Sequence, residues 1–185
     1  MYSIQNPVLV VVDMQNGFLG AKSSYVIPKV RDLVNEIRRR EIPIVFTRFH
    51  NREGSPYETL IGWKRLRDNS ETEITCELQP FIEVVIDKDF YSSFTEEFSH
   101  LAYANNWKTI ILCGVATESC VMKTAVDAFE KGLVPIVVAD ACASHAGNEV
   151  HEAGLMILGR FIGKQQIKST EELLETLSRT TTSTT

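Results

Sequence analysis

The stretch Pro7-Val8-Leu9-Val10-Val11-Val12 is apolar throughout, is rich in β-branched residues, and ends at the charged Asp13. A strand that is buried on both faces has this pattern, because neither of its faces needs polar residues. Similar stretches follow at 42–46, 84–86, 109–113 and 134–139, and a weaker candidate lies at 163–167. The sequence therefore predicts a sheet of buried, mostly parallel strands.

Helical periodicity separates these strands. Apolar residues recur at the spacing of one helix face over 30–37, 121–129 and 150–161. Strands that alternate with helices indicate an α/β domain. We expect a single domain over residues 1–179 and a disordered threonine-rich tail over 180–185. The polar stretch 50–80 interrupts the alternation, and an insert of this length is often a lid or a binding loop.

The composition restricts the class of protein. The 185 residues are 44% hydrophobic and 23% charged, with a formal net charge of −5. This charge argues against nucleic acid or an anionic membrane surface as the main partner. We expect no membrane span and no secretory signal, and hence a cytoplasmic protein. The four cysteines lack CxxC spacing, which argues against a zinc site or a disulfide framework.

Polar residues gather where the predicted strands end. Open α/β sheets bind ligands beyond the carboxyl ends of their strands. Asp13 follows the first strand, Lys88 follows the third, and the segment 114–120 follows the fourth. The sequence therefore predicts that an acid, a lysine and Cys120 converge at one edge of the sheet.

This set of side chains fits nucleophilic catalysis. Thr117 is predicted to cap a helix, which would place Cys120 in the first turn. The helix dipole and the Lys88 ammonium would then stabilise a thiolate. Asp13 would act as general base and return the proton to a leaving amine. Backbone N–H groups over 116–120 would stabilise the oxyanion, and water would hydrolyse the thioester.

Three motifs carry a resemblance to a known family. They are Asp13-Met14-Gln15 after an apolar strand, Lys88 followed by Tyr91-Ser92-Ser93-Phe94, and Gly114-Val115-Ala116-Thr117-Glu118-Ser119-Cys120-Val121. Together and in this order they resemble the isochorismatase-like cysteine hydrolases, which include nicotinamidases and N-carbamoylsarcosine amidohydrolases. The resemblance runs from about Pro7 to Ile167.

The resemblance implies a Rossmann-like three-layer fold with a six-stranded parallel sheet, and a homo-oligomer. It implies that Asp13, Lys88 and Cys120 form the catalytic triad. It also implies a cis peptide between Val115 and Ala116, with the backbone at Val115, Ala116 and Cys120 directed at the oxyanion.

Two departures from the family pattern concern the pocket. Members with a metal place an Asp and two His after the second strand, where this chain has Thr47-Arg48-Phe49-His50. We therefore expect no metal and no other cofactor. The highly charged insert 64–75 lacks the small glycine turn associated with the family, so the pocket should have its own shape.

The sequence also offers candidates for substrate binding. Predicted pocket residues are Gln15, Phe18, Trp63, Tyr91 and Thr117. Arg48 and Arg67 are candidates for holding a substrate carboxylate bidentately.

We expect an amidohydrolase that acts on a small carboxamide or ureido (N-carbamoyl) compound. The alternatives are isochorismatase or nicotinamidase activity, or a non-catalytic Rossmann-like binding protein. A dinucleotide enzyme is disfavoured because no GxGxxG follows the first strand.

Overall fold

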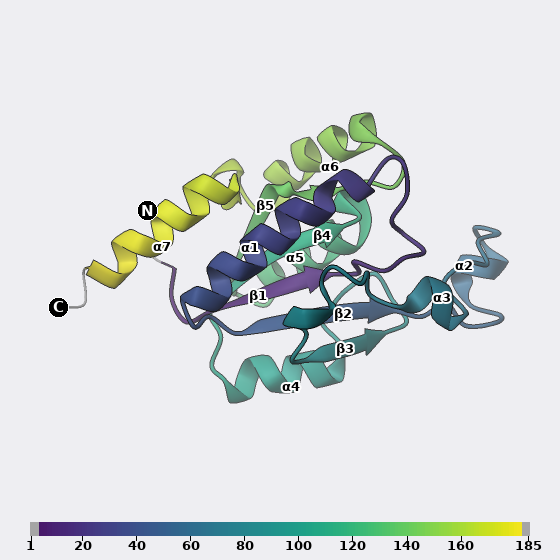
Figure 1. The fold of residues 1–185 in the computed structure, drawn as a ribbon, viewed down its shortest axis with the longest axis horizontal. Coiled ribbons are helices and arrows are strands. Elements are labelled where there is room, and N and C mark those ends of the chain that lie inside the picture. The colour runs from purple at the N-terminus through teal and green to yellow at the C-terminus, as the bar shows by residue number, and fades with distance from the viewer. Residues whose placement is uncertain (1–3, 183–185) are drawn as a thin grey trace.

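A six-stranded parallel sheet with helices on both faces forms the protein, as the computed structural model shows for residues 4–182 (Figure 1). The strand order is β3-β2-β1-β4-β5-β6, and every neighbouring pair is parallel. The strands are β1 (Pro7–Val12), β2 (Ile44–Phe49), β3 (Val85–Lys88), β4 (Thr109–Val115), β5 (Val134–Ala143) and β6 (Ile167–Lys168). The predicted fold class is confirmed.

Each face of the sheet has its own core. The helices are α1 (Ile27–Arg39), α2 (Pro56–Thr59), α3 (Asn69–Thr72), α4 (Glu96–Ala104), α5 (Met122–Glu130), α6 (Asn148–Phe161) and α7 (Thr170–Thr182). Side chains of α1 and α7 share one buried cluster, and side chains of α4, α5 and α6 share the other. None of the helices within residues 4–182 combines the length and apolar character that a membrane crossing requires.

The central strand β1 contributes side chains to the cores on both faces of the sheet. Leu9 and Val11 belong to the cluster on one face, and Val8, Val10 and Val12 belong to the cluster on the other. All five side chains are fully buried. Successive side chains of a strand point to opposite faces, so a strand covered on both sides must be apolar at every position.

Several predicted boundaries are corrected by the structure. β2 runs on to Phe49, and Lys88 is the last residue of β3 rather than a residue beyond it. The weak candidate at 163–167 is mostly a 3₁₀ turn, and β6 is only Ile167–Lys168. Helix α7 extends to Thr182, into the stretch 180–185 that was expected to be a disordered tail, and residues 183–185 lie outside the described part of the chain.

Helix α4 was missed because its apolar periodicity is short. Its signal was a cap: Thr95 precedes two glutamates, and its hydroxyl accepts the Phe98 N–H. A threonine N-cap followed by acidic residues in the first turn is a usual start of a helix.

One glycine permits the close contact between the two central strands at the site. Gly114 on β4 has φ +113°, and a Cβ there would lie 2.2 Å from the Val12 carbonyl oxygen. We expect Gly114→Ala to lower the free energy of unfolding by more than about 2 kcal/mol, because both the backbone and the neighbouring strand oppose the methyl group. Urea denaturation measures this loss.

Gly132 is a matched control for that substitution. It also has a positive φ, +74°, but a Cβ there would meet nothing within 4 Å. Gly132→Ala should cost only about 1 kcal/mol, which is the cost of the backbone conformation alone. Equal losses for the two variants would contradict the role of the close contact with Val12.

Candidate active site

The acid, the lysine and the cysteine meet beyond the ends of the strands. Lys88 Nζ lies 2.7 Å from Asp13 Oδ2 and 3.6 Å from Cys120 Sγ. The side chains of Asp13 and Lys88 are fully buried, and Cys120 is 4% exposed. Lys88 comes from β3, which is separated from β1 by β2, so a long side chain is needed to reach Asp13.

Neighbouring strands and a loop hold the ion pair in place. Thr47 Oγ1 donates to Asp13 Oδ1 at 2.7 Å and accepts the Asp13 N–H at 3.2 Å. Lys88 Nζ donates to the carbonyl oxygens of Phe90 and Tyr91 at 3.0 and 3.1 Å. Asp13 Oδ2 pairs with the Lys88 ammonium at 2.7 Å, and the Cys120 thiol is also within hydrogen-bonding reach of the Asp13 carboxylate.

Cys120 lies in a π-helical turn, Thr117–Val121, that leads into α5. The peptide between Val115 and Ala116 is cis, as the family resemblance implied. The predicted cap is wrong: Ala116 is the N-cap residue, and the Thr117 hydroxyl instead bonds His151 Nδ1 at 2.7 Å.

Burial and the neighbouring Lys88 charge act on the pKa of the Cys120 thiol in opposite directions, with burial the largest effect. Burial raises the pKa of Cys120 to about 12, the nearby Asp13 adds to this, and Lys88 opposes it. Burial alone would lower the pKa of Lys88, but Asp13 and Cys120 outweigh it, so this pKa is raised and the amine stays charged. Burial thus opposes the thiolate that the helix position and Lys88 were expected to favour.

A small cavity of about 210 Å³ lies over Cys120. Its walls are mostly aromatic, and the lining residues are Phe18, Phe49, Tyr57, Ile61, Trp63, Tyr91, Glu118, Ser119, Cys120 and His145. The structure thus brings the predicted Phe18, Trp63 and Tyr91 to the cavity, with the Phe18 and Trp63 rings stacked at 5.8 Å. Thr117, which is fully buried against His151, does not line it.

Gln15 is a structural residue rather than a cavity residue. Its Nε2 donates to the carbonyl oxygens of Phe49 and Thr72 at 2.9 Å each, and its Oε1 accepts the Phe49 N–H at 2.7 Å. All polar atoms of this buried amide are thus used, which corrects its predicted role. Gln15 ties β2 to the insert and thereby fixes one wall of the site.

The chain matches a known protein family over most of its length. The isochorismatase domain profile matches residues 7–165. The chain belongs to the isochorismatase family. It is 30% identical over 158 residues to "Nicotinamidase 3" of Arabidopsis thaliana, covering 81% of this chain and 79% of that protein.

Solved structures of the family have the same fold. The N-carbamoylsarcosine amidase of Thermoplasma acidophilum is 25% identical, with a TM-score of 0.76 over 91% of this chain and 98% of that chain. A cysteine hydrolase of Pseudomonas syringae pv. phaseolicola is 21% identical, with a TM-score of 0.82 and 97% coverage of both chains. The protein is a hydrolase of the isochorismatase family.

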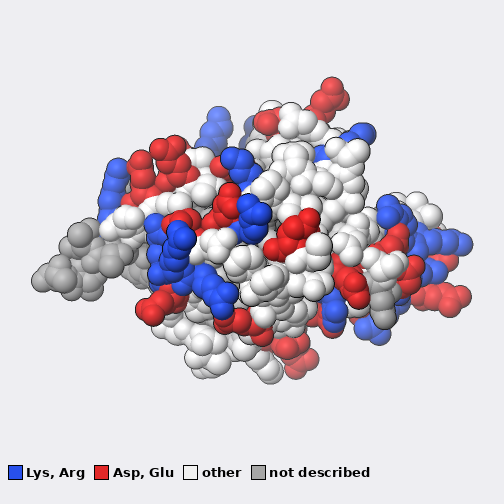
Figure 2. All heavy atoms as spheres, in the orientation of Figure 1, with Lys and Arg blue, Asp and Glu red and all other residues white. Residues whose placement is uncertain are grey.

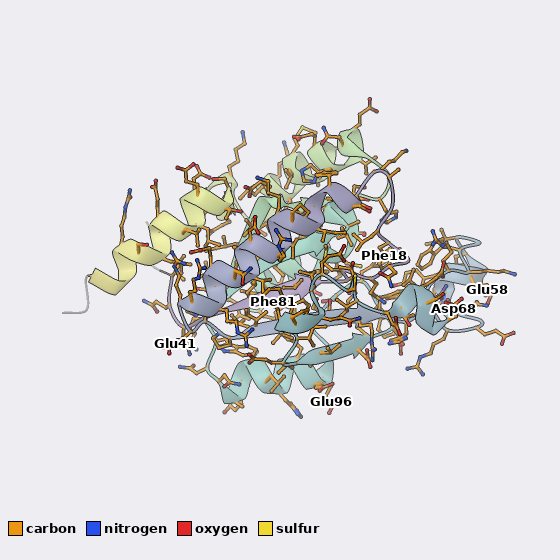
Figure 3. The ribbon with its side chains drawn as sticks, viewed as in Figure 1. Phe18, Glu41, Glu58, Asp68, Phe81 and Glu96 are labelled. Carbon is orange, nitrogen blue, oxygen red and sulfur yellow. The ribbon has the colours of Figure 1, made fainter. Side chains whose placement is uncertain are left out.

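The insert forms the part of this family member that extends beyond the strand ends, where α2 and α3 lie (Figure 1). Figure 2 shows basic and acidic side chains intermixed there, and Figure 3 labels Glu58 and Asp68 at this end of the molecule. Glu58 pairs with Arg67 at 2.6 Å and with Lys64 at 3.3 Å. The backbone N–H of Gly54 and these two cations together lower the pKa of Glu58 to about 2. The charges of the insert thus pair with one another.

The candidate arginines do not reach the cavity. Arg67 is held by Glu58, and Arg48 binds both carboxylate oxygens of Asp87 at 2.7 and 3.0 Å. Neither lines the cavity, so the prediction that they hold a substrate carboxylate is not supported by their placement.

The cluster formed by Arg48, His50 and Asp87 does not fit the metal site of some family members. His50 Nε2 lies 3.1 Å from Asp87, whose two oxygens Arg48 already occupies. The positively charged Arg48 guanidinium on the Asp87 carboxylate would repel a metal cation at this position. Within residues 4–182 no group of three or more His, Cys, Asp or Glu side chains is placed to hold a metal ion.

The raised pKa of Cys120 has a measurable consequence. We expect the rate of its alkylation by iodoacetamide to rise about tenfold per pH unit from pH 7 to 9, because only the thiolate reacts and its fraction grows in that proportion below the pKa. Peptide mass mapping separates Cys120 from the exposed Cys76. A rate that levels off below pH 7 would show a thiolate at rest.

Proposed function

We propose that this protein is an amidohydrolase that cleaves the C–N bond of a small carboxamide or N-carbamoyl compound through a thioester on Cys120. The observation that carries the proposal is the contact of Lys88 with both Asp13 and Cys120 at the base of an aromatic cavity. The relatives named nicotinamidase and N-carbamoylsarcosine amidase support the substrate class. The cavity volume of about 210 Å³ favours a compact substrate.

In the first half of the reaction, Asp13 Oδ2 takes the thiol proton as Cys120 Sγ attacks the carbonyl carbon. The S–C bond forms, and the π electrons of the carbonyl move to oxygen. Backbone N–H groups at Ala116 and Cys120, beside the cis peptide at Val115, would stabilise this oxyanion. Lys88 keeps Asp13 in position and balances its charge.

In the second half, the C–N bond breaks and its electron pair takes the proton from Asp13, so that ammonia or an amine leaves. The acyl group stays on Cys120 as a thioester. Asp13 then removes a proton from water as the water attacks the thioester carbonyl. The C–S bond breaks, the thiol regains a proton, and a carboxylic acid, or a carbamic acid from a ureido substrate, leaves.

The test is a panel of amides and ureido acids, nicotinamide included, with ammonia release measured by a coupled assay. Rapid acid quenching and mass spectrometry should find the acyl mass on the peptide that contains Cys120. Ammonia release with no acyl-Cys120 on any time scale would contradict the covalent route. Turnover of isochorismate but of no amide would favour the isochorismatase alternative, and saturable binding without turnover would favour a non-catalytic protein.

We further propose that the protein forms a homo-oligomer in the cytoplasm, with a small molecule rather than nucleic acid or membrane as its partner. The net charge of −5 supports the last part. On α6, Met156 is 67% exposed and Phe161 is 54% exposed, and such apolar side chains often mark an interface between subunits.

We expect Phe161→Glu to shift the protein toward the monomer in size-exclusion chromatography with light scattering. The reason is that a charge placed in an apolar interface must be desolvated. Tyr103→Glu is the matched control, since Tyr103 is 89% exposed on α4. A wild-type protein that is monomeric at micromolar concentration would contradict the proposal.

A further inference from the structure

The cavity over Cys120 contains one carboxylate, that of Glu118. Glu118 Oε1 accepts a hydrogen bond from Ser144 Oγ at 2.8 Å. Glu118 Oε2 is buried and has no hydrogen-bond partner in the protein. The protein therefore compensates the Glu118 charge with a single hydrogen bond, and a cationic ligand in the cavity would compensate it further.

The carboxylate is held firmly in place. The Ser144 hydroxyl that binds it also accepts the Ala146 N–H at 3.0 Å. Helix α6 packs against the Glu118 backbone at Gly154, where an added Cβ would lie 3.2 Å from Glu118 Cα. Such a fixed negative charge can select ligands, because its position does not adapt to a different ligand.

The cavity offers little to a negatively charged ligand. No lysine or arginine is among its lining residues, and Lys88 below it is paired with Asp13. The one lining side chain that can carry a positive charge is His145, which is exposed and stacks on Phe18 at 5.6 Å. A ligand carboxylate would therefore face Glu118 without a fixed counter-charge.

The aromatic walls favour the opposite charge. Tyr57 and Tyr91 lie edge to face at 5.1 Å, and Tyr57 also lies edge to face with Trp63 at 6.2 Å, which in turn stacks on Phe18. Aromatic faces attract ammonium and other cationic nitrogens. The aromatic rings and Glu118 thus select for the same chemistry.

We propose that Glu118 is a specificity-determining residue whose negative charge at the cavity wall makes the enzyme prefer amides with a cationic group over amides with a carboxylate. This inference rests on the proposed amidohydrolase function for its catalytic meaning. The ligand preference of the cavity can nevertheless be measured without turnover.

The binding test uses three ligands of matched size: benzylammonium, benzyl alcohol and benzoate. They are titrated into the Cys120→Ser protein at pH 8, where a typical imidazole carries little charge, with Trp63 fluorescence as the signal. Benzylammonium should bind at least about tenfold more tightly than benzoate. Glu118→Gln, which can keep the Ser144 hydrogen bond, should remove that difference and leave benzyl alcohol within about twofold.

Glu130→Gln on α5 is the control, because it removes the same charge from an exposed position outside the cavity lining. It should leave all three affinities unchanged. Benzoate that binds as tightly as benzylammonium, or a preference that survives Glu118→Gln, would overturn the inference. The comparison of benzylammonium with benzoate uses a protein in which Glu118 is unchanged. A Glu118 variant that folds poorly therefore cannot hide that result.

The catalytic test compares benzamide with its 4-aminomethyl and 4-carboxy derivatives. Wild-type kcat/KM should be highest for the cationic amide, and Glu118→Gln should lower that value about tenfold through KM rather than kcat. Hydrolysis of all three amides without a charge preference would refute the inference and leave the proposed function intact. Ligand preference without hydrolysis of any amide would refute the proposed function and leave the cavity's selectivity intact.

Discussion

Replacing Cys120 by alanine is expected to lower kcat for any amide substrate by at least about 10⁴-fold, because the variant cannot form the thioester. Burial favours the neutral thiol, and Asp13 and Lys88 remain paired with each other when the sulfur is removed, so the variant leaves no unpaired charge. The free energy of unfolding should therefore change by no more than about 2 kcal/mol. Ammonia release and urea denaturation measure the two effects.

Cys142 is the matched control for that substitution. It is a free, buried cysteine on β5, and burial raises its pKa to about 12, as for Cys120. It does not line the cavity. Cys142→Ala should change stability by a similar amount and retain most of the activity. Activity above about 1% in Cys120→Ala would rule out the covalent mechanism.

Replacing Asp13 by asparagine is expected to lower kcat by at least about 10³-fold, since the neutral thiol loses the base that would deprotonate it. The variant also leaves the buried Lys88 ammonium without its carboxylate partner at 2.7 Å. Breaking a buried ion pair in this way costs about 3–5 kcal/mol of stability. The two losses have different causes and can be separated.

The double variant Asp13→Asn, Lys88→Met separates them. Removal of both charges should restore most of the lost unfolding free energy, because no buried charge is left unpaired. Activity should not return, because the base is still missing. A double variant that regains activity with stability would show that Asp13 acts only by keeping the fold intact.

The sequence was sufficient to predict that Asp13, Lys88 and Cys120 lie close together. Apolar stretches mark buried parallel strands, and the carboxyl ends of such strands share one edge, so Asp13, Lys88 and the segment before Cys120 were expected to meet. The errors of strand length did not matter, because moving Lys88 from a loop to the last residue of β3 leaves it at the same edge. That the triad carries out catalysis stays a prediction.

The walls of the cavity were only partly predictable. Phe49, Tyr57 and His145 line it although no motif marks them, and Gln15 does not line it although it lies within one. Glu118 stands inside the segment that leads to Cys120, which was a signal that could have been used. Sequence gives the residue type, whereas the partner of a polar side chain depends on segments far away along the chain.

The order of apolar and polar residues by itself determined the parallel sheet, its two-sided core and the edge where the site lies, because burial on both faces of a strand leaves a direct pattern in the chain. Only the tertiary structure decided the burial that raises the pKa of Cys120, the use of Thr117 and Gln15 as structural groups, and the unpartnered oxygen of Glu118. These properties depend on burial and on distances between side chains from separate elements, which no local pattern contains.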